Sequence, residues 1–178
     1  MTPLLLSLLL FAAPAAAPSS PLSMAVSTQK KILVVRLNGQ EVKRYDVAVG
    51  TSKHPTPLGR FGVRHIVWNP AWVPPKANWS KGKQPAAPND PKNPMKVVKL
   101  FFQEPDYYIH GTDQEDTLGA AASHGCIRMA QADVYDLARF VMQNGGAPRS
   151  NDWYNQVING TTPADVRLPK AIPLVIGK

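Results

Sequence analysis

Hydrophobic and polar residues alternate along much of the chain, the pattern of half-buried β-strands. Residues 29–50 predict a β-hairpin, because a β-branched run leads into the turn dipeptide Asn38-Gly39 and an alternating return strand. Three further strands are predicted over residues 60–68, 97–102 and 107–109. The apolar tail, 166–176, contains two prolines, which predicts a strand at a sheet edge.

One helix is predicted over residues 133–144, where apolar residues recur at helical spacing. They are Val134, Leu137, Ala138 and Val141. Two glycines follow residue 144 and predict its end, and a shorter helix is predicted over 152–158. Strands therefore dominate, and the expected fold class is mostly β (α+β).

Composition narrows the fold further. The 178 residues suggest one domain, and 18 prolines exclude an all-helical bundle because proline breaks helix interiors. Many of the prolines fall in residues 69–95, a long loop of the kind that is usually functional. The single cysteine excludes a disulfide framework and multi-cysteine zinc motifs. A net charge of +8 suits a carboxylate-rich or polyanionic partner.

The first 25 residues contain no Asp, Glu, Lys or Arg, and a largely apolar run there is too short to span a bilayer. This pattern predicts a signal peptide over residues 1–25, followed by one domain over 26–178. Cleavage after Ala25 and after Ala16 are both compatible with the small residues present, and a lipid-facing anchor is the alternative. The expected location is the periplasm or cell envelope, with no membrane span after removal of the signal.

The residues that could do chemistry cluster late in the chain. Two of the four histidines and the only cysteine lie between His110 and Cys126. On an extended segment His124 and Cys126 project to the same face, and His110 joins them if its strand pairs beside theirs. An imidazole beside a cysteine stabilises the thiolate, which can then attack a carbonyl carbon.

Neighbouring residues supply the other parts of such a site. Backbone N–H groups around Gly125 can stabilise a tetrahedral oxyanion, and Arg128 can pair with a substrate carboxylate. Two other interpretations stay open on spacing alone. Cys126 can be a packed core residue, or it can form a three-ligand metal site with His110 and His124.

The same region resembles the signature of the L,D-transpeptidase (YkuD-type) catalytic domain. Four segments carry the resemblance: His110-Gly111-Thr112 followed by 123–129, Val49-Gly50-Thr51 with 56–61, 69–75, and Asn93-Pro94-Met95. The resemblance implies a mixed β-sandwich or barrel with one main packed helix. It implies that Cys126 is the nucleophile, that His110 is its base, and that the Gly111 carbonyl orients the imidazole.

The substrate-binding and oxyanion side of the site would consist of Ser123, His124, Gly125 and Arg128. Thr51, Trp68 and Trp72 are candidates for the cleft walls. Lysines in the long loop depart from the family pattern and leave substrate choice open (Lys76, Lys81 and Lys83).

The implied reaction is transfer between peptidoglycan stem tetrapeptides. D-Alanine leaves, a thioester forms on Cys126, and a stem amine resolves it into a 3→3 cross-link. Water as the acceptor gives an L,D-carboxypeptidase, and a lipoprotein lysine gives anchoring to the wall. A metal-dependent hydrolase and a non-catalytic wall-binding protein are the remaining alternatives. No cofactor and no nucleic acid partner is expected, carbapenem inhibitors are candidate ligands, and the oligomeric state is open.

Overall fold

The computed structural model describes residues 21–178, so most of the predicted signal peptide lies outside the described residues. The first strand, β1 (Leu22–Ser27), nevertheless begins before residue 25. Its Leu22 and Met24 side chains are buried in the core. A cut after Ala25 would remove most of β1, whereas a cut after Ala16 would leave it whole. We therefore propose the earlier cleavage for the expected export signal.

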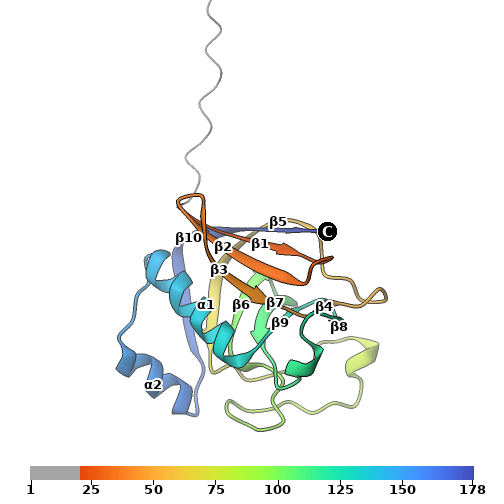
Figure 1. Cartoon of the computed structure of the whole chain (residues 1–178). Coiled ribbons are helices and arrows are strands. Elements are labelled where there is room, and N and C mark those ends of the chain that lie inside the picture. Colours follow the sequence, from red (N-terminus) through yellow and green to blue (C-terminus); the bar gives the residue numbers. More distant parts are fainter. Residues whose placement is uncertain (1–20) are drawn as a thin grey trace, which may run out of the picture.

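One large sheet forms most of the domain (Figure 1). Its other strands are β2 (Ile32–Leu37), β3 (Gln40–Asp46), β5 (Gly59–Trp68), β6 (Lys96–Gln103), β7 (Tyr107–Gly111), β9 (Ile127–Met129) and β10 (Ala164–Gly177). The spatial order is β3-β2-β1-β10-β5-β6-β7-β9, and β4 (Val49–Gly50) pairs separately with β8 (Ala121–Ser123).

The sheet curls until its two edges nearly meet. Ala48, just after edge strand β3, exchanges two backbone hydrogen bonds of 2.9 Å with Arg128 of edge strand β9. These bonds make the sheet a nearly closed barrel, so the predicted mostly-β, barrel-like architecture is confirmed. The predicted hairpin is confirmed as well, since Asn38 and Gly39 adopt positive φ values of 52° and 82° between β2 and β3.

Residues 21–178 form two α-helices. The predicted amphipathic helix is α1 (Gln131–Asn144), and all four residues of its apolar stripe are fully buried. It packs against β6 and β7, and Figure 1 shows it crossing the sheet as the cyan ribbon. The shorter predicted helix is α2 (Asn151–Asn159), whose first turn is capped by Ser150 accepting from the Trp153 N–H at 3.2 Å. Two single 3₁₀ turns, η1 (Asn78–Ser80) and η2 (Glu115–Thr117), complete the helical elements.

The prediction that the tail is an edge strand is wrong, because β10 lies between β1 and β5. The prolines are tolerated for a local reason. Pro169 falls in the irregularity between Arg167 and Ile172, where pairing with β5 is interrupted. Pro173 precedes Leu174, where pairing with β1 starts, so both prolines sit where β10 has a free side.

The strands under α1 direct core residues toward the helix. Ile109 of β7 and Ile127 of β9 are fully buried in the hydrophobic core, as is Leu100 of β6. Because successive side chains point to opposite faces, the residues between these core positions face the other side of the sheet. That outer face carries the candidate site.

Candidate active site

Three adjacent strands place the candidate catalytic residues on one face. β7 pairs antiparallel with β6 and parallel with β9, and this register aligns Lys99, His110 and Arg128 in one row. Cys126 precedes β9 by one residue and, two positions before Arg128, belongs to the same face. All four residues line one cleft. The expected pairing of the His110 strand beside the cysteine segment is thus confirmed.

His110 is a buried, neutral imidazole. Its side chain is only 3% exposed, and Nδ1 lies 2.7 Å from the carbonyl oxygen of Gly111. Burial lowers the pKa of His110 to about 4, with the charges of Arg128 and Lys99 acting in the same direction. When Nδ1–H donates to the Gly111 carbonyl, Nε2 of the neutral ring carries a lone pair and can accept a proton. This is the arrangement that a general base needs.

Gly111 is held where only glycine fits. A Cβ at this position would lie 2.4 Å from the backbone oxygen of Lys96 on β6. The close approach of the two strands fixes the Gly111 carbonyl beside the imidazole, which supports the orienting role expected for it.

Cys126 is a half-buried thiol whose Sγ donates to the Asp106 carbonyl oxygen at 3.3 Å. Within residues 21–178, no hydrogen bond joins Sγ to His110. Burial raises the pKa of Cys126 to about 11, although the Tyr108 N–H and the charge of Arg128 oppose this shift. Burial thus disfavours the charged form of both groups, the Cys126 thiolate and the His110 imidazolium. The thiolate stabilised by an imidazolium stays a prediction.

The segment between β8 and β9 is a tight bend rather than the extended stretch assumed from the sequence. Gly125 has a φ of +112°, which L side chains rarely adopt. The Ser123 hydroxyl ties the bend together: it accepts from the Gly125 N–H at 3.1 Å and donates to the Cys126 carbonyl at 2.5 Å. The Gly125 N–H is therefore already engaged, and it can serve an oxyanion only when Ser123 releases it.

We expect Gly125→Ala to damage both stability and chemistry. The added Cβ would lie 2.7 Å from the Tyr107 ring, in a backbone conformation that costs alanine roughly 1–3 kcal/mol. Gly119→Ala is a matched control, because φ there is +80° and nothing lies within 4 Å of the new Cβ. Thermal unfolding should show losses for both variants, whereas acylation of Cys126 should be impaired only in Gly125→Ala. Equal acylation rates would contradict this account of the bend.

A comparison with known protein families gives a match over most of the chain. The family model of the YkuD L,D-transpeptidase catalytic domain matches residues 23–166. The chain belongs to this family. A Bacillus subtilis protein named YkuD, a candidate L,D-transpeptidase, is 34% identical over 121 residues, which cover 68% of this chain and 61% of the relative. This chain thus spans about three fifths of that relative's length.

Solved structures of L,D-transpeptidases share the fold. The catalytic domain of the Enterococcus faecium enzyme superposes with a TM-score of 0.56 at 16% identity, covering 90% of this chain and 99% of that one. L,D-transpeptidase 3 of Mycobacterium tuberculosis, solved with a faropenem-derived adduct, gives a TM-score of 0.55 at 17% identity, covering 89% and 60%. The L,D-transpeptidase-type fold expected from the sequence is confirmed.

In this member of the YkuD family, His124 connects the catalytic bend to the long loop. Its ring stacks on the Trp79 ring with centroids 4.1 Å apart, and the centroid of the His54 ring lies 4.9 Å from its own. Burial, followed by the charges of His54 and Lys83, lowers the pKa of His124. His124 therefore lines the cleft, as expected, and its ring packs in an aromatic cluster with Trp79 and His54.

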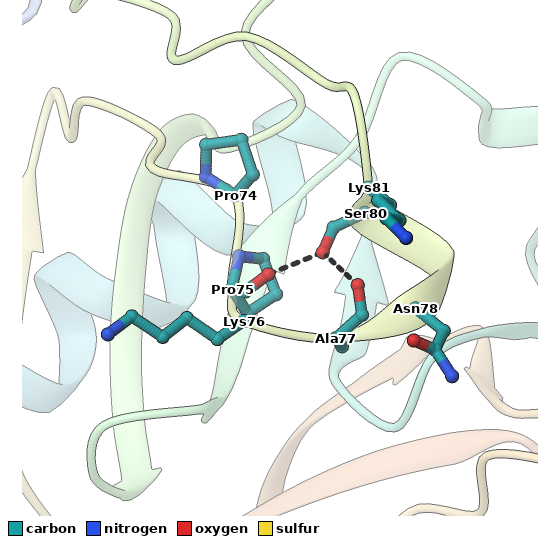
Figure 2. A pocket seen from close by; sticks show the side chains of 7 residues that line it. All are labelled: Pro74, Pro75, Lys76, Ala77, Asn78, Ser80 and Lys81. Atoms are coloured by element: carbon teal, nitrogen blue, oxygen red, sulfur yellow. Dashed lines mark hydrogen bonds between the residues drawn. The ribbon is translucent and has the colours of Figure 1, made fainter.

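The loop over residues 69–95 forms one wall of the catalytic cleft, which has a volume of about 1310 Å³. A second hollow, of about 630 Å³, lies on the same loop. Figure 2 draws its lining residues, among which the Ser80 hydroxyl donates to the carbonyls of Pro75 and Ala77. These bonds close the η1 turn that carries Trp79. The loop is thus an ordered wall of the site, held by its own hydrogen bonds.

Of the three residues predicted to form the cleft walls, one lines the cleft. Trp72 lines the cleft as expected, whereas Trp68 is a fully buried core residue, with its indole N–H directed at Met142 sulfur at 3.0 Å. Thr51 does not line the cleft. The structure adds Lys99 and Tyr108 to the cleft lining. Strand register brings them there, and the sequence of one strand does not indicate which residue of another strand lies beside it.

The alternative of a metal site finds no support in the described ligands. Within residues 21–178, no three His, Cys, Asp or Glu side chains are grouped so as to hold a metal ion, and His110, His124 and Cys126 are no exception. In the same part of the chain, none of the helices has the length and apolar character needed to cross a bilayer.

Proposed function

We propose that this chain is a cysteine-dependent L,D-transpeptidase that acts on peptidoglycan stem tetrapeptides. Cys126 is acylated, D-alanine is released, and a 3→3 cross-link forms. The observation that carries the proposal is that Cys126 and His110, from paired segments, line one large cleft. Membership of the YkuD family supports it.

The neutral resting pair determines how acylation proceeds. As Sγ attacks the carbonyl carbon of the stem residue at position 3, Nε2 of His110 accepts the thiol proton. The tetrahedral oxyanion is stabilised by backbone N–H groups of the bend, that of Cys126 foremost. When the C–N bond breaks, the imidazolium returns the proton to the amine of D-alanine, which leaves a thioester on Cys126.

Deacylation reverses the proton flow. A stem amine attacks the thioester carbon, His110 accepts the proton that this amine loses, and the sulfur departs and recovers it as a thiol. Water in the same position yields the free tripeptide acid, which is L,D-carboxypeptidase activity, and a lipoprotein lysine yields an anchored protein. Only the acceptor differs, so these outcomes use the same catalytic groups.

The test is to incubate the purified protein with a disaccharide tetrapeptide, with and without an added amine acceptor, and to determine the product masses. We expect loss of D-alanine and, with the amine present, a cross-linked or amine-capped product. Tripeptide alone in both reactions would indicate a carboxypeptidase. An unchanged tetrapeptide would overturn the proposal.

Two further measurements separate the other classes of function. A thiol-directed alkylating agent should abolish turnover, whereas a strong chelator should leave it intact, which is the reverse of the result for a metal-dependent hydrolase. A carbapenem should add its whole mass to Cys126, because Sγ opens the β-lactam amide as it would a peptide. The basic charge of the chain suits the carboxylates of the cell wall, and we propose that the protein works after export to the periplasm or envelope.

A further inference from the structure

A cation stands on each side of His110 in the strand register. Lys99 is its antiparallel partner on β6, and Arg128 is its parallel partner on β9. Directly opposed residues have Cβ atoms roughly 5 Å apart, so both cations begin close to the imidazole. The row cation–imidazole–cation lines the cleft beside Cys126.

The two cations differ in what they already bind. Arg128 donates to the Gln114 side chain at 2.9 Å. Lys99 Nζ lies over the rings of Phe101 and Tyr108, 4.9 and 5.4 Å from their centroids. Within the described residues 21–178, no hydrogen bond or ion pair holds this ammonium group.

Among residues 21–178, no carboxylate forms an ion pair with the Lys99 ammonium group. Lys99 is half-buried, and burial lowers its pKa even though Asp165 and Cys126 pull in the opposite direction. Buried charges in proteins are normally paired. Among the described residues that line the cleft, Asp106 is the only carboxylate, against Lys76, Lys83, Lys99 and Arg128. A substrate carboxylate can therefore supply the ion-pair partner that this lysine lacks among the described residues.

Building on the proposed function, we infer that Lys99 is a specificity residue that binds a free carboxylate of the donor stem next to the scissile amide. Two carboxylates of such a donor lie close enough to that amide. One is the terminal carboxylate of the leaving D-alanine, and the other is the carboxylate on the side chain of the diamino acid at position 3. Both present the same chemistry to an ammonium group, and the substrate class is an acidic rather than an amidated stem.

The test combines enzyme variants with amidated donors. Wild type, Lys99→Met and Lys99→Arg are compared on three tetrapeptides: the free acid, the terminal carboxamide and the diamino-acid carboxamide. Lys170→Met, an exposed residue of β10 that does not line the cleft, controls for the loss of one positive charge. D-Alanine release gives kcat and KM, and thermal unfolding checks each variant's fold.

We expect Lys99→Met to lose about 10- to 100-fold in kcat/KM on the free acid, the value of a charge-assisted hydrogen bond, chiefly through a higher KM. Wild type should lose a similar factor on one of the two amidated donors, and Lys99→Met should be indifferent to that same amidation. This donor then identifies which carboxylate is bound. Lys99→Arg should retain most of the preference for acid, and Lys170→Met should match wild type.

Two results would overturn the inference, and they are distinguishable. The carboxylate subsite is wrong, and the proposed function stands, if wild type turns over the free acid and Lys99→Met has the same kcat/KM. The same conclusion holds if Lys99→Met loses as much kcat/KM as wild type on each amidated donor. If wild type releases D-alanine from none of the three donors, the proposed function fails and takes this inference with it.

Discussion

Replacing Cys126 by alanine is expected to abolish D-alanine release and cross-linking, by a factor of roughly a thousand or more, in a protein that still folds. The reason is that the thioester has no other sulfur on which to form, since Cys126 is the only cysteine. Its side chain is half-buried and sits at the cleft rather than in the core cluster, so truncation should change the free energy of unfolding by only about 1 kcal/mol. Product masses and thermal unfolding measure the two effects separately.

Cys126→Ser tests the nature of the nucleophile more closely. Even the native thiol, whose pKa burial raises to about 11, depends on His110 to lose its proton. A serine hydroxyl is a still weaker acid, and we expect the serine variant to be inactive in turnover and unable to retain the mass of a carbapenem. Substantial activity in either variant would rule out sulfur as the nucleophile and return attention to the metal-dependent alternative.

Replacing His110 by glutamine is expected to lower the acylation rate of Cys126 by about 10²- to 10⁴-fold at neutral pH. In wild type the base is already unprotonated there, because burial lowers the pKa of His110 to about 4. The wild-type rate should therefore fall only on acidification toward this value. The glutamine variant should instead rise with pH toward the thiol pKa of about 11, as hydroxide replaces the missing base. Identical pH profiles for the two proteins would contradict the assignment of His110 as base.

The same group should make wild type sensitive to acid. The folded protein holds His110 at a pKa of about 4, against about 6.5 for the unfolded chain, so the unfolded state binds more protons between these values. Stability is fully present above pH 6.5 and is lost as pH falls toward 4, by about 3 kcal/mol from this group. Urea unfolding at several pH values should show this loss in wild type, and a smaller loss in His110→Gln. Equal losses would mean that His110 is not the buried neutral group described.

Local patterns predicted the elements well where burial is one-sided. The stripe from Val134 to Val141 predicted α1, and the Asn38-Gly39 dipeptide predicted the hairpin, because both signals are contained in neighbouring residues. The signal peptide predicted over residues 1–25 overlaps the first four residues of β1, since an apolar strand and the end of an export signal have the same composition. β10 was assigned to an edge, since the prolines do not reveal where along the strand its second neighbour begins.

At the candidate site, residue chemistry and tertiary environment contributed different things. The spacing of His110 and Cys126 was enough to propose a nucleophile and its base, since their strands could pair. Their protonation states could not be predicted this way. Burial lowers the pKa of the imidazole and raises that of the thiol, and burial depends on residues far away in the chain.

The sequence alone therefore determined which chemical groups this protein can use: one thiol, an imidazole sixteen positions before it, and a glycine and an arginine on either side of the thiol. Only the tertiary structure decided that Lys99 stands beside that imidazole without a counter-charge and that Trp79 stacks on His124. The physical reason is that strand register and loop packing join residues distant in the chain, whereas a linear pattern records only the preferences of near neighbours.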